Sequence, residues 1–435
     1  MALFVPNPDA ESVEEIIEQL SLELARAYRE AEDELIREVA VRAVRDMEIA
    51  AGLPVNLLGL TPEGRRRQNR VLADLAGHRA RAVRELQGIA VAIVERLRVA
   101  DLARRVIEVA ATEGEAAAAA MLGLAGRQPT AVVPLPFLGT RTQISALTTT
   151  GNAAQAVAMV ALNLQSRLEV LNQRITRYPQ DAYQRIIALH SPNTLLGITT
   201  SKVQQAAAVQ RFLAEGVTDF VDRGGRRWTI GAYAEMAGRT SVNRAYNDAG
   251  VWRMQQSGIN LVTVVRGLDS CRKCAEWAGK ILSTDGTPAG TYELPHATED
   301  GTSTVTVDAT VEAARNAGWG HPNCRCRLVP YMVGLTVPQD DTTYDEAAEK
   351  ERAEQRRLER EIRAAKRDEA TAMTDTARAK AARAVRQAQA EMRGFIEQTG
   401  RLRQSYREQL HFADGRRGYE RPSASAGRPR DAVSP

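Results

Sequence analysis

The segments Cys271-Arg-Lys-Cys274 and His321-Pro-Asn-Cys-Arg-Cys326 decide how the middle of this 435-residue chain folds. They contain all four cysteines of the sequence, and no cysteine occurs elsewhere. The four tryptophans lie in the same part of the chain, at Trp228, Trp252, Trp277 and Trp319. Residues that bind metals and residues that pack densely are therefore concentrated together, which predicts a compact module.

The spacing of the cysteines predicts a metal site. Two thiolates separated by two residues can bind one tetrahedral ion, because the intervening turn brings their sulfur atoms together. The candidate ligands are Cys271, Cys274, His321, Cys324 and Cys326. In the simplest closed site, the first three cysteines are joined by either His321 or Cys326. We expect such a site to hold a structural zinc ion, because four protein ligands leave no open position for a reacting water. The alternatives are four reduced core cysteines, or a disulfide formed after assembly.

The rest of the chain is rich in Ala, Glu and Arg, and aromatic residues make up only 5% of the sequence. This composition is typical of extended helical assemblies. Four cysteines in a chain of this length do not form a disulfide framework, so synthesis in a reducing compartment is expected. Residues 1–7 are too short for a signal peptide, and no run of about 18 apolar residues would span a bilayer. We therefore expect a soluble chain, made in the cytosol.

Residues 1–127 are predicted to form a helical hairpin or small bundle. Ser12 opens a capping box, and apolar residues then recur at steps of three and four. The pair Thr61-Pro62 starts a further helix, which the apolar pattern extends to about Leu124. An apolar stripe of this kind indicates a packing face rather than a cofactor site.

The next two regions are predicted to be a linker with helices, over residues 128–199, and the compact module, over residues 200–337. The linker is the proline-containing stretch Gly126–Gly151. The expected elements are helices over 152–171, 181–190, 201–214 and 230–247, a hairpin turn at Gly224-Gly225, and strands over 260–266 and 303–307.

Residues 338–412 are predicted to form charged C-terminal helices. The first, Glu346–Asp368, alternates Glu, Arg and Lys and is expected to be solvated. The second carries apolar residues, including Met392, that would pack on the N-terminal hairpin or on a partner. Residues 413–435 lack apolar residues to bury and are expected to be a disordered basic tail. The predicted fold class is mainly α with a small α+β module, in which long helices flank a compact Cys/His-stapled central domain.

Catalytic sequence patterns are absent. The chain contains no phosphate-binding Gly-x4-Gly-Lys-Ser/Thr, no Gly-x-Ser-x-Gly and no His-Glu-x-x-His. Four of the arginines near the module, Arg226, Arg227, Arg239 and Arg244, are expected to be a solvated or ion-paired surface. Of the histidines outside the clusters, only His296 lies between them and stays a possible ligand. We therefore expect no enzymatic activity.

Three segments of the module resemble one family in order and spacing. They are Asp222–Thr240, with its Gly-Arg-Arg-Trp and Arg-Thr, Cys271–Leu282, with its Cys-x-x-Cys and Gly-Lys, and His321–Tyr331. Together they resemble the minor capsid protein 2 family of tailed phages, which is related to the Mu F-like head-morphogenesis proteins. The close resemblance covers about residues 200–335. One departure is that Val265–Ser270 lacks the histidine that many members place before the first cysteine pair.

The resemblance implies a structural minor capsid protein, made in the host cytoplasm and incorporated into the virion. Its expected partners are the portal protein and other capsid proteins, with no membrane and no small-molecule substrate. It is expected to act at the portal vertex and in head assembly. Residues 378–435 contain 13 basic and 6 acidic residues, a net charge of +7 in a chain of +4. This basic C-terminal segment is therefore expected to contact packaged DNA, whose phosphates attract Lys and Arg.

The alternative hypothesis is a metal-stapled nuclease of the HNH kind that acts on DNA. Such a site needs a general-base histidine beside other metal-binding residues. The segment His321-Pro-Asn323 provides residues of the right types, but no Asp-His pair precedes it.

Overall fold

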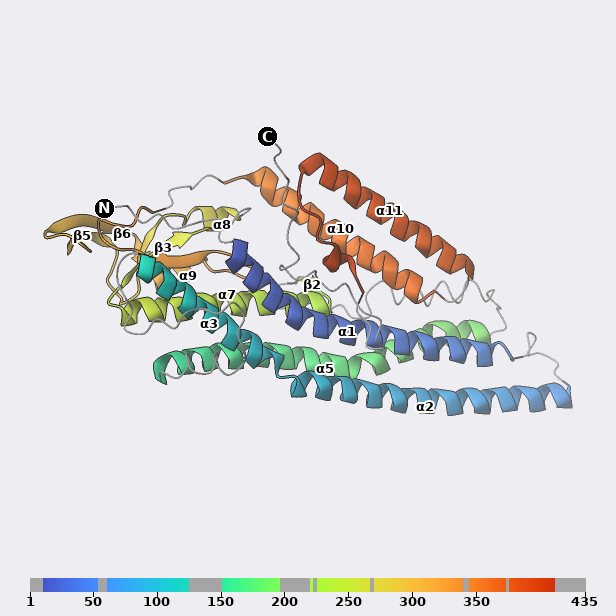
Figure 1. Ribbon diagram of the computed structural model, residues 1–435. Helices are drawn as coiled ribbons and strands as arrows, with labels where there is room; N and C mark the ends of the chain where they lie inside the picture. The colour runs from blue at the N-terminus through green and yellow to red at the C-terminus, as the bar shows by residue number, and fades with distance from the viewer. Residues whose placement is uncertain are drawn as a thin grey trace, which may run out of the picture. The chain divides into compact units, whose positions relative to one another are not determined.

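The computed structural model describes residues 11–53, 61–124, 151–195, 220–221, 225–266, 270–338, 344–372 and 375–410. The chain divides into two compact units. Unit 1 comprises residues 1–28, 92–175 and 219–352, and unit 2 comprises residues 29–91, 176–218 and 353–435. The fold is mainly α with a small α+β module, which confirms the predicted class (Figure 1).

Unit 2 contains a core made by three long helices: α1 (Glu11–Ala50), α2 (Pro62–Val99) and α5 (Gly151–Leu195). Leu86 and Tyr183 are fully buried there, with Ile36 and Ile186 packed in the same cluster. The predicted start of α2 is confirmed, because the Gly64 N–H donates to the Thr61 hydroxyl over 3.1 Å. The periodic apolar face, rather than any special residue, therefore organises this core.

Two helix boundaries differ from the prediction. The helix expected to continue to Leu124 is interrupted after Val99, and α3 begins anew at Leu102 and ends at Leu124. Asp101 adopts a positive φ of 44°, which a continuous helix does not allow. The two helices expected over 152–171 and 181–190 are instead one helix, α5, which passes through Pro179. Buried residues on both sides of Pro179 keep α5 continuous, although proline removes one helical hydrogen bond.

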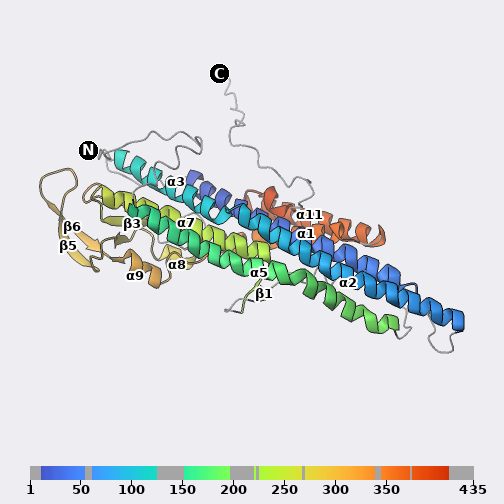
Figure 2. The same cartoon turned by 90° about the horizontal axis from the view of Figure 1, so that it is seen from below.

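In unit 1, α3 and α7 (Ile230–Gln256) run side by side (Figures 1 and 2). Glycines at their crossing allow the backbones to meet: a Cβ built on Gly114 would lie 2.1 Å from the Tyr246 carbonyl oxygen. The helix expected over 230–247 is confirmed and extends further, to Gln256. Its start is capped by Thr229, whose hydroxyl accepts from the Ala232 N–H over 3.2 Å.

The module contains a four-stranded sheet in the order β7-β4-β3-β8. Its strands are β3 (Leu261–Val265), β4 (Ile281–Ser283), β7 (Ala309–Thr310) and β8 (Arg327–Pro330). β3 pairs antiparallel with β4 and β8, with Val262 opposite Leu282 and Pro330, and β4 pairs parallel with β7. Short helices α8 (Arg272–Ala275) and α9 (Val311–Asn316) lie between the strands in the sequence.

Two hairpins accompany this sheet. β5 (Gly290–Pro295) pairs with β6 (Thr302–Val307), and β1 (Phe220–Val221) pairs with β2 (Arg227–Trp228) around Gly225, whose φ is +76°. The strand expectations for 260–266 and 303–307 and the hairpin expectation are therefore confirmed. β4, β5, β7 and β8 were not predicted from the sequence.

The C-terminal helices α10 (Glu346–Ala370) and α11 (Asp375–Thr399) pack on each other through Leu358, Ile362 and Met392. The apolar residues of the second helix thus pack on α10, whereas the sequence led us to expect packing on the N-terminal hairpin or on another protein. α10 is also less solvated than predicted, because Gln355 and Glu359 are buried. Both side chains lie next to the segment that ends in a short 3-10 helix, η1 (Ser405–Glu408): Arg356 bridges Glu359 and Gln404 at 2.8 Å.

Several expectations lie outside the described residues: the side chain of Ser12, the linker at 126–150, the helix over 201–214 and the tail at 413–435. None of the described helices has the length and apolarity needed to cross a membrane.

Candidate metal centre

The first ligand turn is built by α8. Cys271 caps this helix, and its carbonyl oxygen accepts from the N–H groups of Cys274, at 2.9 Å, and Ala275, at 3.0 Å. This tight turn directs both thiols to the same side, as the Cys-x-x-Cys spacing predicts. The turn lies between β3 and β4, so the sheet fixes its two ends.

The second ligand turn precedes β8. The Cys324 N–H donates to the His321 carbonyl oxygen over 2.9 Å, which closes the turn around Pro322 and Asn323. Asn323 has a φ of +67°, a left-handed conformation that asparagine tolerates better than most residues. Gly320, directly before the turn, has a φ of +68°. The sequence His-Pro-Asn-Cys thus contains the residue types that this turn geometry requires.

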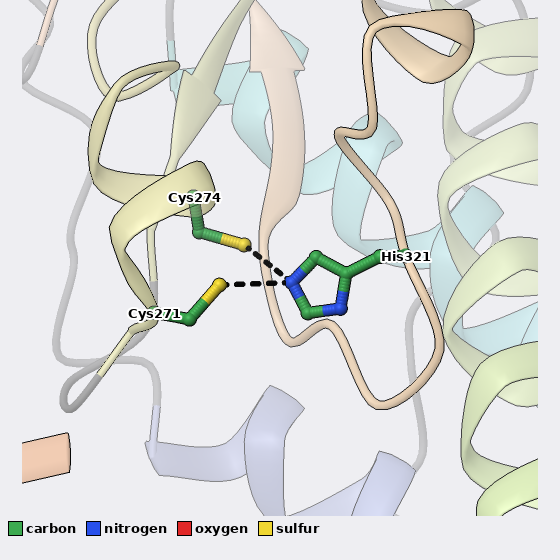
Figure 3. Close-up of side chains that lie close together, drawn as sticks. All are labelled: Cys271, Cys274 and His321. Carbon is green, nitrogen blue, oxygen red and sulfur yellow. Dashed lines mark hydrogen bonds between the residues drawn. The ribbon is translucent and has the colours of Figure 1, made fainter.

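The two turns meet in the structure. The His321 Nε2 lies 2.9 Å from the Cys271 Sγ and 3.4 Å from the Cys274 Sγ (Figure 3). The Cys274 Sγ also lies 3.5 Å from the Cys324 Sγ. The ligand atoms form two overlapping groups, Cys271–Cys274–His321 and Cys274–Cys324–Cys326, within which all atoms lie inside 4.8 Å of one another. Cys274 belongs to both groups and is the centre of the cluster.

Two of these three distances fit a tetrahedral ion. Zinc–sulfur bonds of about 2.3 Å and zinc–nitrogen bonds of about 2.0–2.1 Å place neighbouring ligand atoms roughly 3.5–3.8 Å apart. The separations of 3.4 Å for Cys274–His321 and 3.5 Å for Cys274–Cys324 are close to this range. The 2.9 Å contact of Cys271 with His321 is shorter and is a hydrogen-bond distance. Adjoining the ligands is a cavity of about 30 Å³, enough for at least one water molecule.

A hydrogen bond orients His321 for metal binding. Its Nδ1 lies 2.8 Å from the Pro322 carbonyl oxygen, which can only accept, so we assign the ring proton to Nδ1. The Nε2 lone pair then points at Cys271 and Cys274. Histidine ligands in metal sites are commonly held in this way, with the second ring nitrogen bonded to a carbonyl.

The sulfur atoms are mostly shielded from water. Cys274, Cys324 and Cys326 are buried, Cys271 is half-buried, and all four are free thiols rather than disulfides. The hydrogen bond between Cys274 and Cys324 raises the pKa of Cys274 and lowers the pKa of Cys324. The Cys326 N–H also donates to the Cys324 Sγ over 3.4 Å. Hydrogen bonding to the Cys324 sulfur favours its charged form.

Two asparagines of α7 hold the second turn in place, and sequence reasoning missed both. The Asn243 side chain donates to the Cys324 carbonyl oxygen over 3.0 Å. Asn247 donates to the Cys326 carbonyl oxygen over 3.2 Å and accepts from the Leu328 N–H over 2.8 Å. The available signal was their four-residue spacing, which continues from Glu235 and Arg239 along the same side of the helix.

Arg239, one turn before Asn243, ties the same ligand turn to α1. It donates to the Asn323 side-chain oxygen over 3.0 Å and to Glu18 and Glu235 over 3.0 Å and 2.8 Å. Arg325 approaches Glu18 as well, at 3.7 Å. The expectation of an ion-paired arginine is correct for Arg239, but its side chain is buried rather than at a solvated surface.

His296 does not join the cluster. Its Nδ1 accepts from the N–H groups of Thr298 and Glu299, and its Nε2 lies over Gly334. Neither candidate metal group of the described residues includes it. All five predicted ligands are thus brought together, while His296, the one further possible ligand, instead accepts hydrogen bonds within the loop after β5.

Comparisons with known proteins match the family that the sequence of this module resembles. The family model described as "Phage minor capsid protein 2" matches residues 99–397, more than half of the chain. A "Structural protein" of Lactococcus phage LL-H is 27% identical over 237 residues, which cover 52% of this chain and 60% of that relative. The chain thus matches less than two thirds of that relative's length. No solved structure matches.

The nuclease hypothesis finds no support. His321 faces two cysteine sulfurs, and the Asn323 side-chain oxygen is occupied by Arg239. Within the described ranges, the residues grouped for metal binding are cysteines and this one histidine. Such a set is typical of closed structural zinc sites.

Proposed function

Because this chain belongs to the phage minor capsid protein 2 family, we propose that it is a structural virion protein of the portal vertex that takes part in head assembly. The meeting of the two Cys/His turns is the observation that carries the proposal. The joined turns would hold the module in one shape, which a protein of an assembly needs. A closed set of cysteine and histidine ligands leaves no open position at which a metal could activate a water molecule. The function is therefore architectural rather than catalytic.

We propose that the cluster binds one zinc ion through Cys271, Cys274, His321 and Cys324. Each of these residues has a ligand atom in contact with another member of the set. Cys326 then acts from outside the set, through its N–H bond to the Cys324 sulfur. Elemental analysis of the purified full chain should find about one zinc per chain. A chain purified from zinc-supplemented cells with no bound metal would contradict this.

The portal-facing surface is proposed to be the outer side of α5. Met159, Leu162 and Val170 are 62%, 55% and 48% exposed there. They recur at steps of three and eight, so they share one side of the helix. No charged residue lies between Gly151 and Arg167, the stretch that contains Met159 and Leu162, whereas Val170 directly follows Glu169. Exposed apolar side chains that gather in an uncharged stretch are typical of protein interfaces.

Capture by the portal protein tests this surface. The double variant M159S/L162S should lose capture of the full chain by immobilised portal protein. The matched control is V41S/V91S, which replaces two isolated valines that are 58% and 53% exposed. Equal capture of both variants would move the interface elsewhere, and no capture of the wild-type chain would remove portal binding from the proposal.

We propose that the basic C-terminal segment contacts DNA, but through only some of its basic residues. Arg407 is buried, and Arg403 is paired with Glu408 at 2.6 Å, so the fold uses part of the positive charge. Four exposed basic residues of α11 are available for phosphates: Lys380, Arg383, Arg386 and Arg393. Replacing all four with glutamine should weaken DNA binding and reduce its salt dependence. An unchanged salt dependence would assign these residues another role.

A further inference from the structure

A row of arginines on α2 has no role in the metal centre or in the proposed partner surfaces. Arg66, Arg67, Arg70, Arg81 and Arg84 are all exposed. Steps of four, eleven and three residues separate Arg66, Arg70, Arg81 and Arg84, so all four lie on one side of the helix. The acidic residues Glu63, Asp74 and Glu95 share that side, and Glu85 lies in line with Arg67. We call these five arginines the α2 arginine row.

The row is not neutralised within the described part of the chain, where no ion pair involves any of its five members. Some other exposed arginines, by contrast, are paired: Arg98 with Glu169 at 2.5 Å, and Arg104 with Asp101 at 2.5 Å. Like charges along one side of a helix repel each other and lower its stability. The opposite side of α2 carries the packing, through Leu75, Ala82 and Leu86. The row therefore costs stability and gives none to the fold.

Two glycines inside α2 point to a partner at the same surface. Gly77 and Gly88 lie on the side of the row, and each costs about 1 kcal/mol relative to alanine in a helix interior. Nothing in the chain requires them: a Cβ at Gly88 meets no atom within 4 Å, and one at Gly77 meets only Arg81, at an ordinary 3.5 Å. Glycine at such positions allows another molecule to approach the helix backbone closely.

A groove borders the row between α1 and α2. Its volume is about 480 Å³, and its charged and polar lining comprises Arg45, His78 and Arg81 together with the carboxylates Glu48 and Asp74. The row itself runs for 18 residues from Arg66 to Arg84, or about 27 Å at the helical rise. That length is about four-fifths of one turn of duplex DNA, which is about 34 Å.

We infer that the α2 arginine row binds the phosphate backbone of duplex DNA. Guanidinium groups match phosphate oxygens in geometry as well as charge. A protein partner would be expected to use large apolar or aromatic anchors, and the side of α2 that carries the row has none between Arg66 and Arg84. This inference goes beyond the proposed function, because it needs neither the metal nor the portal, and it concerns a different helix from the C-terminal segment.

The test measures binding of the full chain to a fluorescent 30-base-pair duplex over a range of salt concentrations. The variant R66Q/R70Q/R81Q/R84Q removes four charges from the row. With each phosphate contact contributing about 0.9 to the slope of log K against log salt, the slope should fall by about 3–4 and the affinity at least about tenfold. The substitutions are exposed, so the thermal midpoint should stay near that of the wild-type chain.

Two controls separate the inference from its rivals. R98Q/R104Q/R105Q/R357Q removes the same charge from arginines that have carboxylate partners. An equal loss of affinity in this control would show that only net charge matters and would overturn the inference. A loss confined to K380Q/R383Q/R386Q/R393Q would also overturn it, while leaving the proposed C-terminal contact intact. Equal binding of polyglutamate, lost in the same α2 variant, would indicate an acidic protein instead of DNA.

Discussion

The module of unit 1 and the helical core of unit 2 are stable for different reasons. The core of unit 2 is built from helices of 38 to 45 residues, whose apolar side chains repeat regularly. The core of unit 1 includes a helix of four residues, α8, and a strand of three, β4. Elements this short are not stable alone. They depend on a shared apolar core and on specific links, which are the Cys/His cluster and the asparagines of α7.

The difference teaches that the two cores should fail in different ways. In a long helix, the loss of one contact removes only a small part of the packing, and the other contacts keep the helix in place. A short turn that carries ligands loses its structure when one ligand is removed, because metal binding and folding are then one equilibrium.

The largest effect is expected for Cys274→Ser, which removes the atom shared by both ligand groups. Structural zinc contributes on the order of 10 kcal/mol to the folding of small domains. The variant should bind no zinc and lose the native fluorescence of buried Trp319, while most of the helical circular dichroism stays. Native fluorescence with no bound metal would show that packing alone holds the module.

A companion pair of variants identifies the fourth ligand. His321→Ala should abolish tight zinc binding, whereas Cys326→Ala should keep it. If Cys326→Ala abolished zinc binding and His321→Ala kept it, the fourth ligand would be Cys326.

Leu86→Ala tests the helical core, where Leu86 is fully buried. The cavity should lower the free energy of unfolding by about 3–5 kcal/mol. Zinc content should not change, which is what distinguishes the two cores. Leu402→Ala is the control, because Leu402 is 86% exposed and its loss should leave the denaturation midpoint in place.

Gly114→Ala tests the helix crossing beneath the module. A Cβ there would lie 2.1 Å from a backbone oxygen of α7, so the helices must separate, at a cost of about 3 kcal/mol or more. Gly123→Ala on the same helix meets no atom within 4 Å and should stabilise it by about 0.5–1 kcal/mol. Denaturant unfolding measures both, and equal effects would mean that the crossing is not close.

Glu115, the residue after Gly114, should make stability depend on pH. Burial raises the pKa of Glu115 to about 7, against 4.5 for a free side chain, with Arg253 opposing the shift. A raised carboxyl pKa means that the unfolded chain ionises first. Stability should therefore fall by up to about 3 kcal/mol as pH rises from about 4.5 to 7, and then level off. Glu115→Gln should remove most of this fall; an unchanged profile would assign it to other groups.

The sequence predicted best what depends on local pattern. The long helices follow from apolar periodicity, the start of α2 from Thr61-Pro62, and β3 from its β-branched run. The five metal-ligand candidates followed from spacing, and the structure brings all of them together.

What the sequence did not reveal depends on contacts between distant residues. The Asn247 side chain accepts a hydrogen bond from Leu328, 81 positions away, and no residue near Asn247 in the sequence indicates this contact. β4 and β8 are too short to show the alternation of apolar and polar residues that marks a strand. In β8 all four residues are buried, so buried and exposed positions do not alternate. The unbroken passage of α5 through Pro179 reflects packing on both sides, which overrides local propensity.

The ligand turn at His321–Cys324 has a consequence for how an ion would be captured. Proline restricts its own backbone, Asn323 already adopts the left-handed conformation, and Arg239 and Thr240 hold that asparagine through 3.0 Å and 3.2 Å hydrogen bonds. The ligands are preorganised, so little entropy remains to be lost on binding. A site of this kind selects by size: ions that need longer bonds or more ligands would have to distort a turn that the polypeptide has already fixed.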